Sequence, residues 1–188
     1  MKIEDGTGTG RLVGVTLDNQ LFAKCTTASV EHYINHHYGE AYNVLFEQAP
    51  TAGDDCIIYI ENGNDEDLVI EGVQLSVSGA SEVYIQLNDL GTRNAATDLT
   101  PANLNTGTGN LADGEFEVGA DLDGGAATLA GGVEIERYVF RAASDTNDFN
   151  FDQDVFITKN RTMTIWCDAI VTVNGTIMFH YANEAVEG

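Results

Sequence analysis

The feature that most constrains the fold of this chain is a series of short runs in which apolar and polar residues alternate. A period of two places one face of a strand toward a core and the other toward solvent, and no segment shows an apolar stripe with helical spacing. Turn residues separate the runs at intervals of about 8–12 residues, as in sandwiches and jelly rolls. The runs are 11–17, 21–27, 41–49, 54–62, 68–78, 81–89, 133–142 and three more within 155–182. The sequence therefore predicts an all-β chain: an antiparallel β-sandwich or jelly-roll-like domain preceded by an extended N-terminal arm.

Turn residues predict how these strands connect. Asn174-Gly175 is the pair most typical of a two-residue hairpin turn, and Lys159-Asn160 marks a second turn. Hairpins are also expected for the pair 11–17 and 21–27 and for the pair 68–78 and 81–89.

Two segments do not follow the alternating pattern. Residues 28–38 are a candidate for a short helix, although their aromatic and β-branched residues weaken that interpretation. Residues 90–131 are rich in Gly, Asn, Ala and Thr, so we expect mostly loop there, with a short strand at 116–118. A loop this long in a compact domain usually serves a contact or a function.

The N-terminal segment differs from the rest of the chain. Residues 6–10 alternate Gly with Thr, and Ile3 is the one apolar residue beyond Met1 in the first ten, so this segment predicts a flexible lead that orders on a partner. Residues 1–24 carry three basic and three acidic residues, so the remainder carries the entire net charge of −22. We therefore divide the chain into an arm with a β-hairpin and connector, 1–40, and a β-sandwich domain, 41–188.

The acidic charge limits the classes of partner. With 30 acidic and 8 basic residues, the chain is not expected to bind nucleic acid through a basic face. Such a charge keeps surfaces soluble, and it is also common in proteins exposed to high salt. No apolar run is long enough for a membrane-spanning helix, and the N-terminus lacks a secretory signal pattern, so we expect synthesis in the cytoplasm.

Cysteine and histidine supply few candidates for chemistry. Cys25, Cys56 and Cys167 are far apart and form no CxxC pair, so we interpret them as buried, reduced thiols. His32, His36 and His37 have a spacing that could hold a metal on a helix, but no HExxH pattern accompanies them. A connector or a subunit contact is the simpler interpretation, and His180 in the last strand is expected to be structural.

Two acidic segments and one glycine-rich segment resemble known ligand-binding loops. Asp121 and Asp123 resemble part of a calcium loop, but Gly132 stands where an EF-hand needs Glu, so turn chemistry explains them and the similar segment 62–67. The Gly-Thr segment 6–11 lacks the preceding strand and following helix of a phosphate loop. Without a GxSxG elbow, we predict a non-enzymatic protein with no cofactor and no assigned metal.

A sequence resemblance gives a more specific expectation. The opening pattern comprises Glu4-Asp5 and the Gly-Thr repeat, then Val13, Val15, Asp18-Asn19 and Leu21. It resembles the start of small β-sandwich virion structural proteins of tailed bacteriophages, and residues 57–62 and 67–77 are similar to a later part of the same proteins. Together these segments cover about a quarter of the chain. The extreme acidity and the segment 90–131 depart from the family's pattern.

The resemblance implies a head decoration, or cement, protein that binds the major capsid protein on the exterior of the virion. It also implies a homo-oligomer, a trimer in this class of protein. The arm residues expected to contact the capsid are Lys2, Ile3, Arg11, Leu12, Val13 and Val15.

Two other functions remain open at this stage. One is a tail, baseplate or fibre-associated β-domain, although no heptad or fibrous repeat is visible. The other is a carbohydrate-binding module, which would need exposed rings among the strand aromatics; core burial is their more common fate. These aromatics are Tyr59, Tyr84, Tyr138, Trp166 and Phe179.

Overall fold

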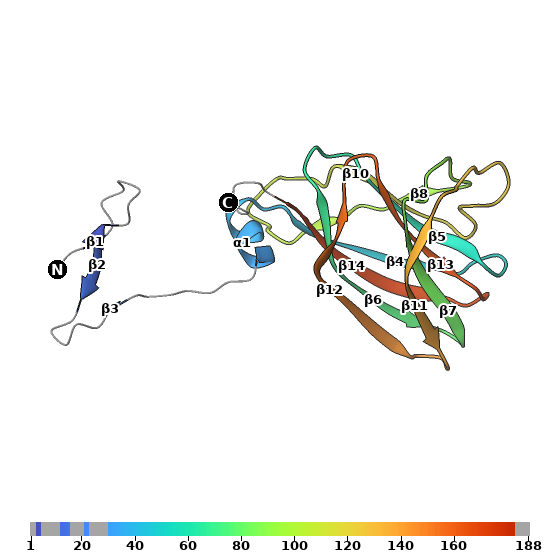
Figure 1. Ribbon diagram of the computed structural model, residues 1–188. Helices are drawn as coiled ribbons and strands as arrows, with labels where there is room; N and C mark the ends of the chain where they lie inside the picture. Colours follow the sequence, from blue (N-terminus) through green and yellow to red (C-terminus); the bar gives the residue numbers. More distant parts are fainter. Residues whose placement is uncertain (1–2, 5–11, 16–20, 23–29, 183–188) are drawn as a thin grey trace. The chain divides into compact units, whose positions relative to one another are not determined.

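The computed structural model describes residues 3–4, 12–15, 21–22 and 30–182, and the chain divides into two compact units, Met1–Val30 and Glu31–Gly188 (Figure 1). In the first unit, three antiparallel strands pair in the order β1 (Ile3–Glu4), β2 (Leu12–Val15) and β3 (Leu21–Phe22). The predicted hairpin is therefore confirmed, with shorter strands. Within the lead that was expected to be flexible, Ile3–Glu4 forms a strand, with Ile3 opposite Val13 of β2, and the Gly-Thr residues 6–10 lie outside the described residues.

The second unit contains one short helix and then strands only. Helix α1 (Val30–His37) confirms the helix candidate in 28–38. The long strands are β4 (Ala41–Gln48), β5 (Asp55–Asn62), β6 (Leu68–Val77), β7 (Ser81–Leu87), β11 (Val133–Phe140), β12 (Thr146–Ile157), β13 (Thr162–Cys167) and β14 (Val173–Tyr181). The short strands are β8 (Thr97–Asp98), β9 (Ala102–Asn103) and β10 (Gly114–Val118). Strand β10 confirms the short strand expected at 116–118. No helix in this described part is long and apolar enough to cross a membrane.

The strands form two antiparallel sheets that pack as a sandwich (Figure 1). One sheet has six strands in the order β11-β7-β13-β5-β10-β8, and the other has five in the order β12-β6-β14-β4-β9. Each connection between consecutive long strands crosses from one sheet to the other, except the connection from β7 to β11. This is the strand order of a jelly roll, so the predicted fold class is confirmed.

The same topology shows that the hairpin predicted for residues 68–78 and 81–89 was wrong. Strands β6 and β7 follow each other closely but lie in different sheets, so residues 68–78 and 81–89 do not pair. The turn predicted at Lys159-Asn160 is confirmed, with Asn160 at a φ of 59°, and it joins β12 and β13, which lie in opposite sheets. Alternation shows which face of a strand is buried and carries no information on which strand is its neighbour.

Asn174-Gly175 is inside strand β14 and is not a turn. A Cβ atom at Gly175 would lie 2.4 Å from the Phe46 ring and 2.9 Å from Leu75 Cδ2. Glycine is needed at this position because neighbouring side chains fill the space above the backbone. The motif that normally predicts a hairpin here serves packing instead.

Aromatic residues connect the two sheets in the core. The Phe179 ring on β14 stacks on Tyr42 of β4 at 5.4 Å and on Phe116 of β10 at 5.1 Å. Since β10 belongs to the six-stranded sheet, this stack spans the interior of the sandwich. Aliphatic residues from both sheets, among them Ile58 and Ile177, are buried around it.

The sandwich unit begins earlier than the predicted boundary at residue 41. Ile34 of α1 is buried, and the Asn105 side-chain amide donates to the Asn35 carbonyl at 2.7 Å. The Asn103 amide donates to the Gly39 carbonyl at the same distance. These bonds attach α1 and its connector to the sandwich, so Glu31–Gly188 is the compact unit.

Candidate functional site

The long segment between β7 and β11 packs over the outer face of the six-stranded sheet. Its Leu122 and Leu129 contact Cys56, Tyr59 and Trp166 and form a second, smaller core. Backbone bonds hold it in place: the Leu122 N–H donates to the Cys56 carbonyl at 3.0 Å, and Leu90 and Ala130 bond to each other in both directions. The segment expected to serve a contact or a function therefore has a clear packing role within its own chain.

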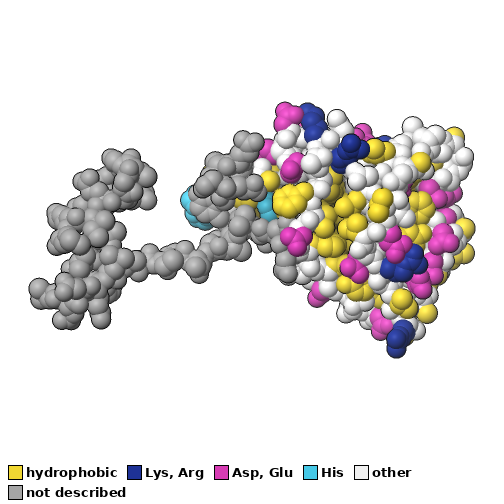
Figure 2. All heavy atoms as spheres, in the orientation of Figure 1, with side chains coloured by type: hydrophobic (Ala, Val, Ile, Leu, Met, Phe, Trp, Pro, Cys, Tyr) yellow, Lys and Arg dark blue, Asp and Glu magenta, His cyan; other side chains and the backbone are white. Residues whose placement is uncertain are grey.

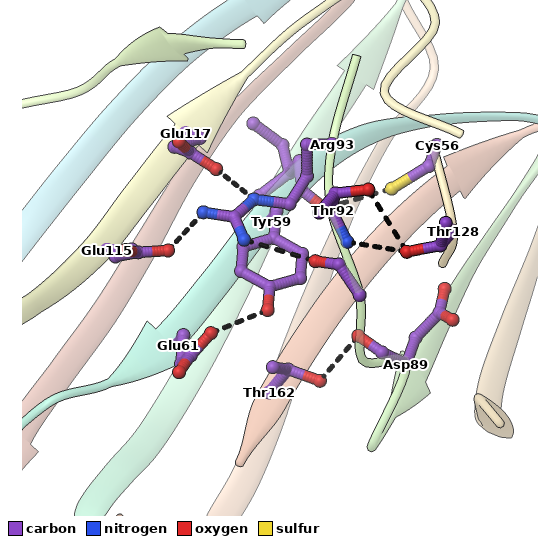
Figure 3. Close-up of polar contacts among 12 residues, drawn as sticks. Cys56, Tyr59, Glu61, Asp89, Thr92, Arg93, Glu115, Glu117, Thr128 and Thr162 are labelled. Atoms are coloured by element: carbon purple, nitrogen blue, oxygen red, sulfur yellow. Dashed lines mark hydrogen bonds and ion pairs between the residues drawn. The ribbon is translucent and has the colours of Figure 1, made fainter. Parts of the chain in front are cut away.

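One arginine of this segment, Arg93, contacts several side chains on the outer face of the six-stranded sheet (Figure 3). The Arg93 guanidinium lies 4.1 Å from the centre of the Tyr59 ring and pairs with Glu115 and Glu117 of β10. The Tyr59 hydroxyl donates to Glu61 at 2.7 Å. Burial lowers the pKa of Arg93, but the bond to Glu117 and the nearby charges outweigh it, so the pKa is raised and the cation is retained.

The chemistry of this cluster is structural. Burial, followed by the bond to Glu61, raises the pKa of Tyr59 well above its usual value, so the phenol stays protonated. Burial likewise raises the pKa of Cys56, with smaller effects from Asp89 and Asp123, so its thiol is a poor nucleophile. The Arg93 guanidinium, its two glutamates and the Tyr59 hydroxyl in Figure 3 are already paired, and their arrangement fits a loop anchor.

A group of three carboxylates lies near the start of β5. Asp55, Asp121 and Asp123 each place an oxygen within 4.8 Å of the others, and among the described residues they form the group that could hold a metal ion. Two of these carboxylates already accept bonds, Asp123 from the Cys56 N–H and Asp55 from the Ala52 N–H, each at 2.7 Å. Three carboxylates supply only part of the six to eight oxygens that Ca²⁺ prefers. The structure thus brings Asp121 and Asp123 together with Asp55, which sequence reasoning missed.

Residues 62–67, the other calcium-like fragment, form the turn between β5 and β6. The Asn64 N–H donates to the Asn62 side chain at 2.9 Å, and the Glu66 N–H donates to the Asn64 side chain at 3.1 Å. Turn chemistry is therefore confirmed for this segment.

Asp89 is a buried carboxylate in the segment between β7 and β11. Its Oδ2 has no hydrogen-bond partner among the described residues. Burial and then the charge of Asp123 raise its pKa. Because its folded-state pKa is above the unfolded value, its contribution to stability is complete below about pH 4 and is lost as the pH rises through the raised pKa. Above its raised pKa, the charged form of Asp89 opposes folding.

We therefore expect Asp89→Asn to raise the urea midpoint of unfolding at pH 7, with the difference shrinking toward pH 4. The amide keeps an acceptor oxygen and removes the charge. Urea titrations of both chains at several pH values measure this. A variant that is less stable than the wild type at pH 7 would show that the carboxylate is needed in its charged form.

The predicted arm residues have the following positions. Ile3 lies in β1, directly opposite Val13 of β2. Leu12 and Val15 also lie in β2, so these four residues belong to one three-stranded sheet. Lys2 and Arg11 lie outside the described residues, and no side chain of this unit is described.

The described histidines and cysteines have the following positions. His36 and His37 are exposed on α1 with their rings 4.9 Å apart, whereas the His32 side chain lies outside the described residues. His180 is buried, with its Nδ1 2.7 Å from Glu71. Cys56 and Cys167 are buried free thiols, as predicted, and Cys25 lies outside the described residues.

The strand aromatics do not form an exposed platform. Tyr59, Tyr84 and Phe179 are buried, and Tyr138 and Trp166 are partly buried. A groove of about 730 Å³ does lie on the outer face of the five-stranded sheet. Its lining includes Leu45, Gln74, Asn174 and Thr176, two carboxylates, Glu47 and Asp148, and no Lys or Arg of the described chain.

The chain was compared with protein-family models, curated proteins and solved structures, and none of them matches it.

Proposed function

We propose that this protein is a non-enzymatic structural protein of a tailed-phage virion, a decoration protein that binds the assembled head from outside and stabilises it. The observation that carries the proposal is the division of the chain into two units, a small β-sheet unit at Met1–Val30 and a jelly-roll sandwich at Glu31–Gly188. The jelly roll is an architecture of viral capsid proteins and of lectins, so it is compatible with the role without specifying it.

In this proposal the first unit is the anchor. It has no net charge over residues 1–24 and contains the apolar strand Leu12–Val15. Apolar contact and backbone pairing to an exposed strand of the major capsid protein would hold it on the shell. Lys2, Ile3, Arg11, Leu12, Val13 and Val15 are the proposed contact residues.

The sandwich faces the solvent. Its acidic surface repels other particles and keeps decorated heads apart. A protein that binds the assembled shell and not the free subunit stabilises the shell by mass action. Several copies, proposed as a homotrimer, would add avidity because each contributes an arm.

A carbohydrate-binding module is the second candidate, and the groove between Leu45 and Asn174 favours it. Its amide and hydroxyl side chains suit neutral sugar hydroxyls, and its carboxylates disfavour anionic ligands. Co-sedimentation with assembled shells tests the first candidate; a protein that stays in solution and instead binds neutral glycans would support the second.

A further inference from the structure

The groove on the outer face of the five-stranded sheet has a regular floor. Its side chains form two rows across β4, β14, β6 and β12, because residues directly opposite each other point to the same face of a sheet. In that strand order the first row is Leu45, Thr176, Gln74 and Asp148. The second row is Glu47, Asn174, Ser76 and Thr146. Since neighbouring strands are about 4.8 Å apart, each row is about 14 Å long.

The two carboxylates of the groove lie at opposite corners of this floor. Glu47 stands at the β4 end of one row, and Asp148 stands at the β12 end of the other. Both are exposed, and neither forms an ion pair within the described part of the chain. No described Lys or Arg lines the groove. A ligand lying across the groove therefore meets a negative charge near each end, and charge complementarity favours a ligand with positive charges.

Between the two corners the floor is polar and uncharged. The amides of Gln74 and Asn174 and the hydroxyls of Ser76 and Thr176 can each donate and accept hydrogen bonds. Sugar hydroxyls also do both, whereas a linear aliphatic amine in its charged form only donates. Leu45, which is 65% exposed, offers apolar contact to the C–H groups of a sugar ring. A volume of about 730 Å³ is within the range of small-ligand sites, so a short oligosaccharide fits.

We infer that this groove binds a short oligosaccharide of amino sugars with free amines, such as a fragment of chitosan. Ring hydroxyls bond to the amides and hydroxyls of the floor, and ammonium groups toward the two ends of the ligand pair with Glu47 and Asp148. The inference rests on the second candidate function and deepens it, because it narrows the glycan from a neutral to a cationic one. The anchor proposed for shell binding lies in the other unit of the chain, Met1–Val30, and is not involved.

Figure 2 shows Asp and Glu side chains at many places on one face of the sandwich, so binding in the groove has to be separated from a general attraction of cations. The test is isothermal titration calorimetry of the full chain with a glucosamine trisaccharide at about pH 6, where amines are protonated and carboxylates are ionised. We expect Glu47→Gln and Asp148→Asn each to weaken binding by at least about tenfold. The matched control is Asp98→Asn, which removes one exposed charge from β8 in the other sheet and should bind like the wild type.

Two further ligands separate the contributions of charge and of the sugar ring. The N-acetylated trisaccharide has the same rings without the charges, and spermidine has the charges without the rings. Each should bind at least about tenfold more weakly than the glucosamine trisaccharide. Equal binding of either ligand, or equal losses in all three variants, would overturn the inference. Circular dichroism should show the same fold for the wild type and every variant.

Shell binding is measured separately on the same proteins. A chain that binds shells but no amino sugar contradicts the inference and leaves head decoration intact. A chain that binds the N-acetylated and the free-amine sugar equally well contradicts the inference and keeps the glycan candidate. A chain that binds amino sugars in the groove but no shells contradicts head decoration alone.

Discussion

Replacing Leu12, Val13 and Val15 by serine in the full chain is expected to weaken binding to assembled shells by at least about a hundredfold. Burying a Val or Leu side chain contributes about 1.5–3 kcal/mol each, and every copy of an oligomer loses the same contacts. The three residues lie in β2 of the first unit, which has its own antiparallel sheet. Co-sedimentation of the protein with shells, titrated to saturation, measures the change.

The control for this experiment is Leu111→Ser, which removes an exposed apolar side chain from the sandwich. Shell affinity should stay within about twofold of the wild type, since surface substitutions usually have small effects. Equal affinity for the triple variant and the wild type would show that the first unit is not the anchor.

Arg93→Ala is expected to lower the free energy of unfolding by about 2 kcal/mol, because hydrogen bonds to charged groups are strong and the remaining carboxylates would repel one another. Arg93 pairs with Glu115 and Glu117, and Glu115 lies directly opposite Glu61 in the sheet. Its stacking on Tyr59 would be lost as well. Urea unfolding at low ionic strength measures the effect, and added salt should recover part of it by screening the carboxylates.

Two variants give this prediction its specificity. Arg93→Lys keeps the charge but loses the planar, two-pronged pairing, so it should fall between the wild type and Arg93→Ala. Arg141→Ala removes an exposed arginine and should change stability by less than about 0.5 kcal/mol. If Arg93→Ala has no larger effect than Arg141→Ala, the Arg93 cluster does not anchor the loop.

The fold class could be predicted from the sequence because burial of one strand face leaves a period of two. The run 41–49 became β4 (Ala41–Gln48), and 133–142 became β11 (Val133–Phe140). Strand pairing could not be predicted from local pattern, since consecutive strands of a jelly roll lie mostly in opposite sheets. Gly175 looks like a turn residue in sequence and is instead fitted against the Phe46 ring.

The packing of the segment between β7 and β11 on the six-stranded sheet could not be predicted, because the residues that make this contact are far apart in sequence. Leu122 and Leu129 are isolated apolar residues in a Gly-rich segment, and their packing on Cys56 depends on the completed sheet. Arg93 did leave a signal: it is the only basic residue between Lys24 and Arg137, a stretch that contains many acidic residues, which is typical of a paired structural cation. The arm residues rest on resemblance, and the pairing of Ile3 with Val13 is the structural observation that accompanies it.

The most direct measurement is co-sedimentation of the full chain with shells assembled from the major capsid protein of the same phage, beside unassembled capsid protein as the comparison. A decoration protein should pellet with the assembled shells at a fixed ratio of copies to capsid subunits, and it should leave the unassembled protein unbound. A chain that remains in the supernatant with assembled shells at saturating concentration would contradict a role in head decoration.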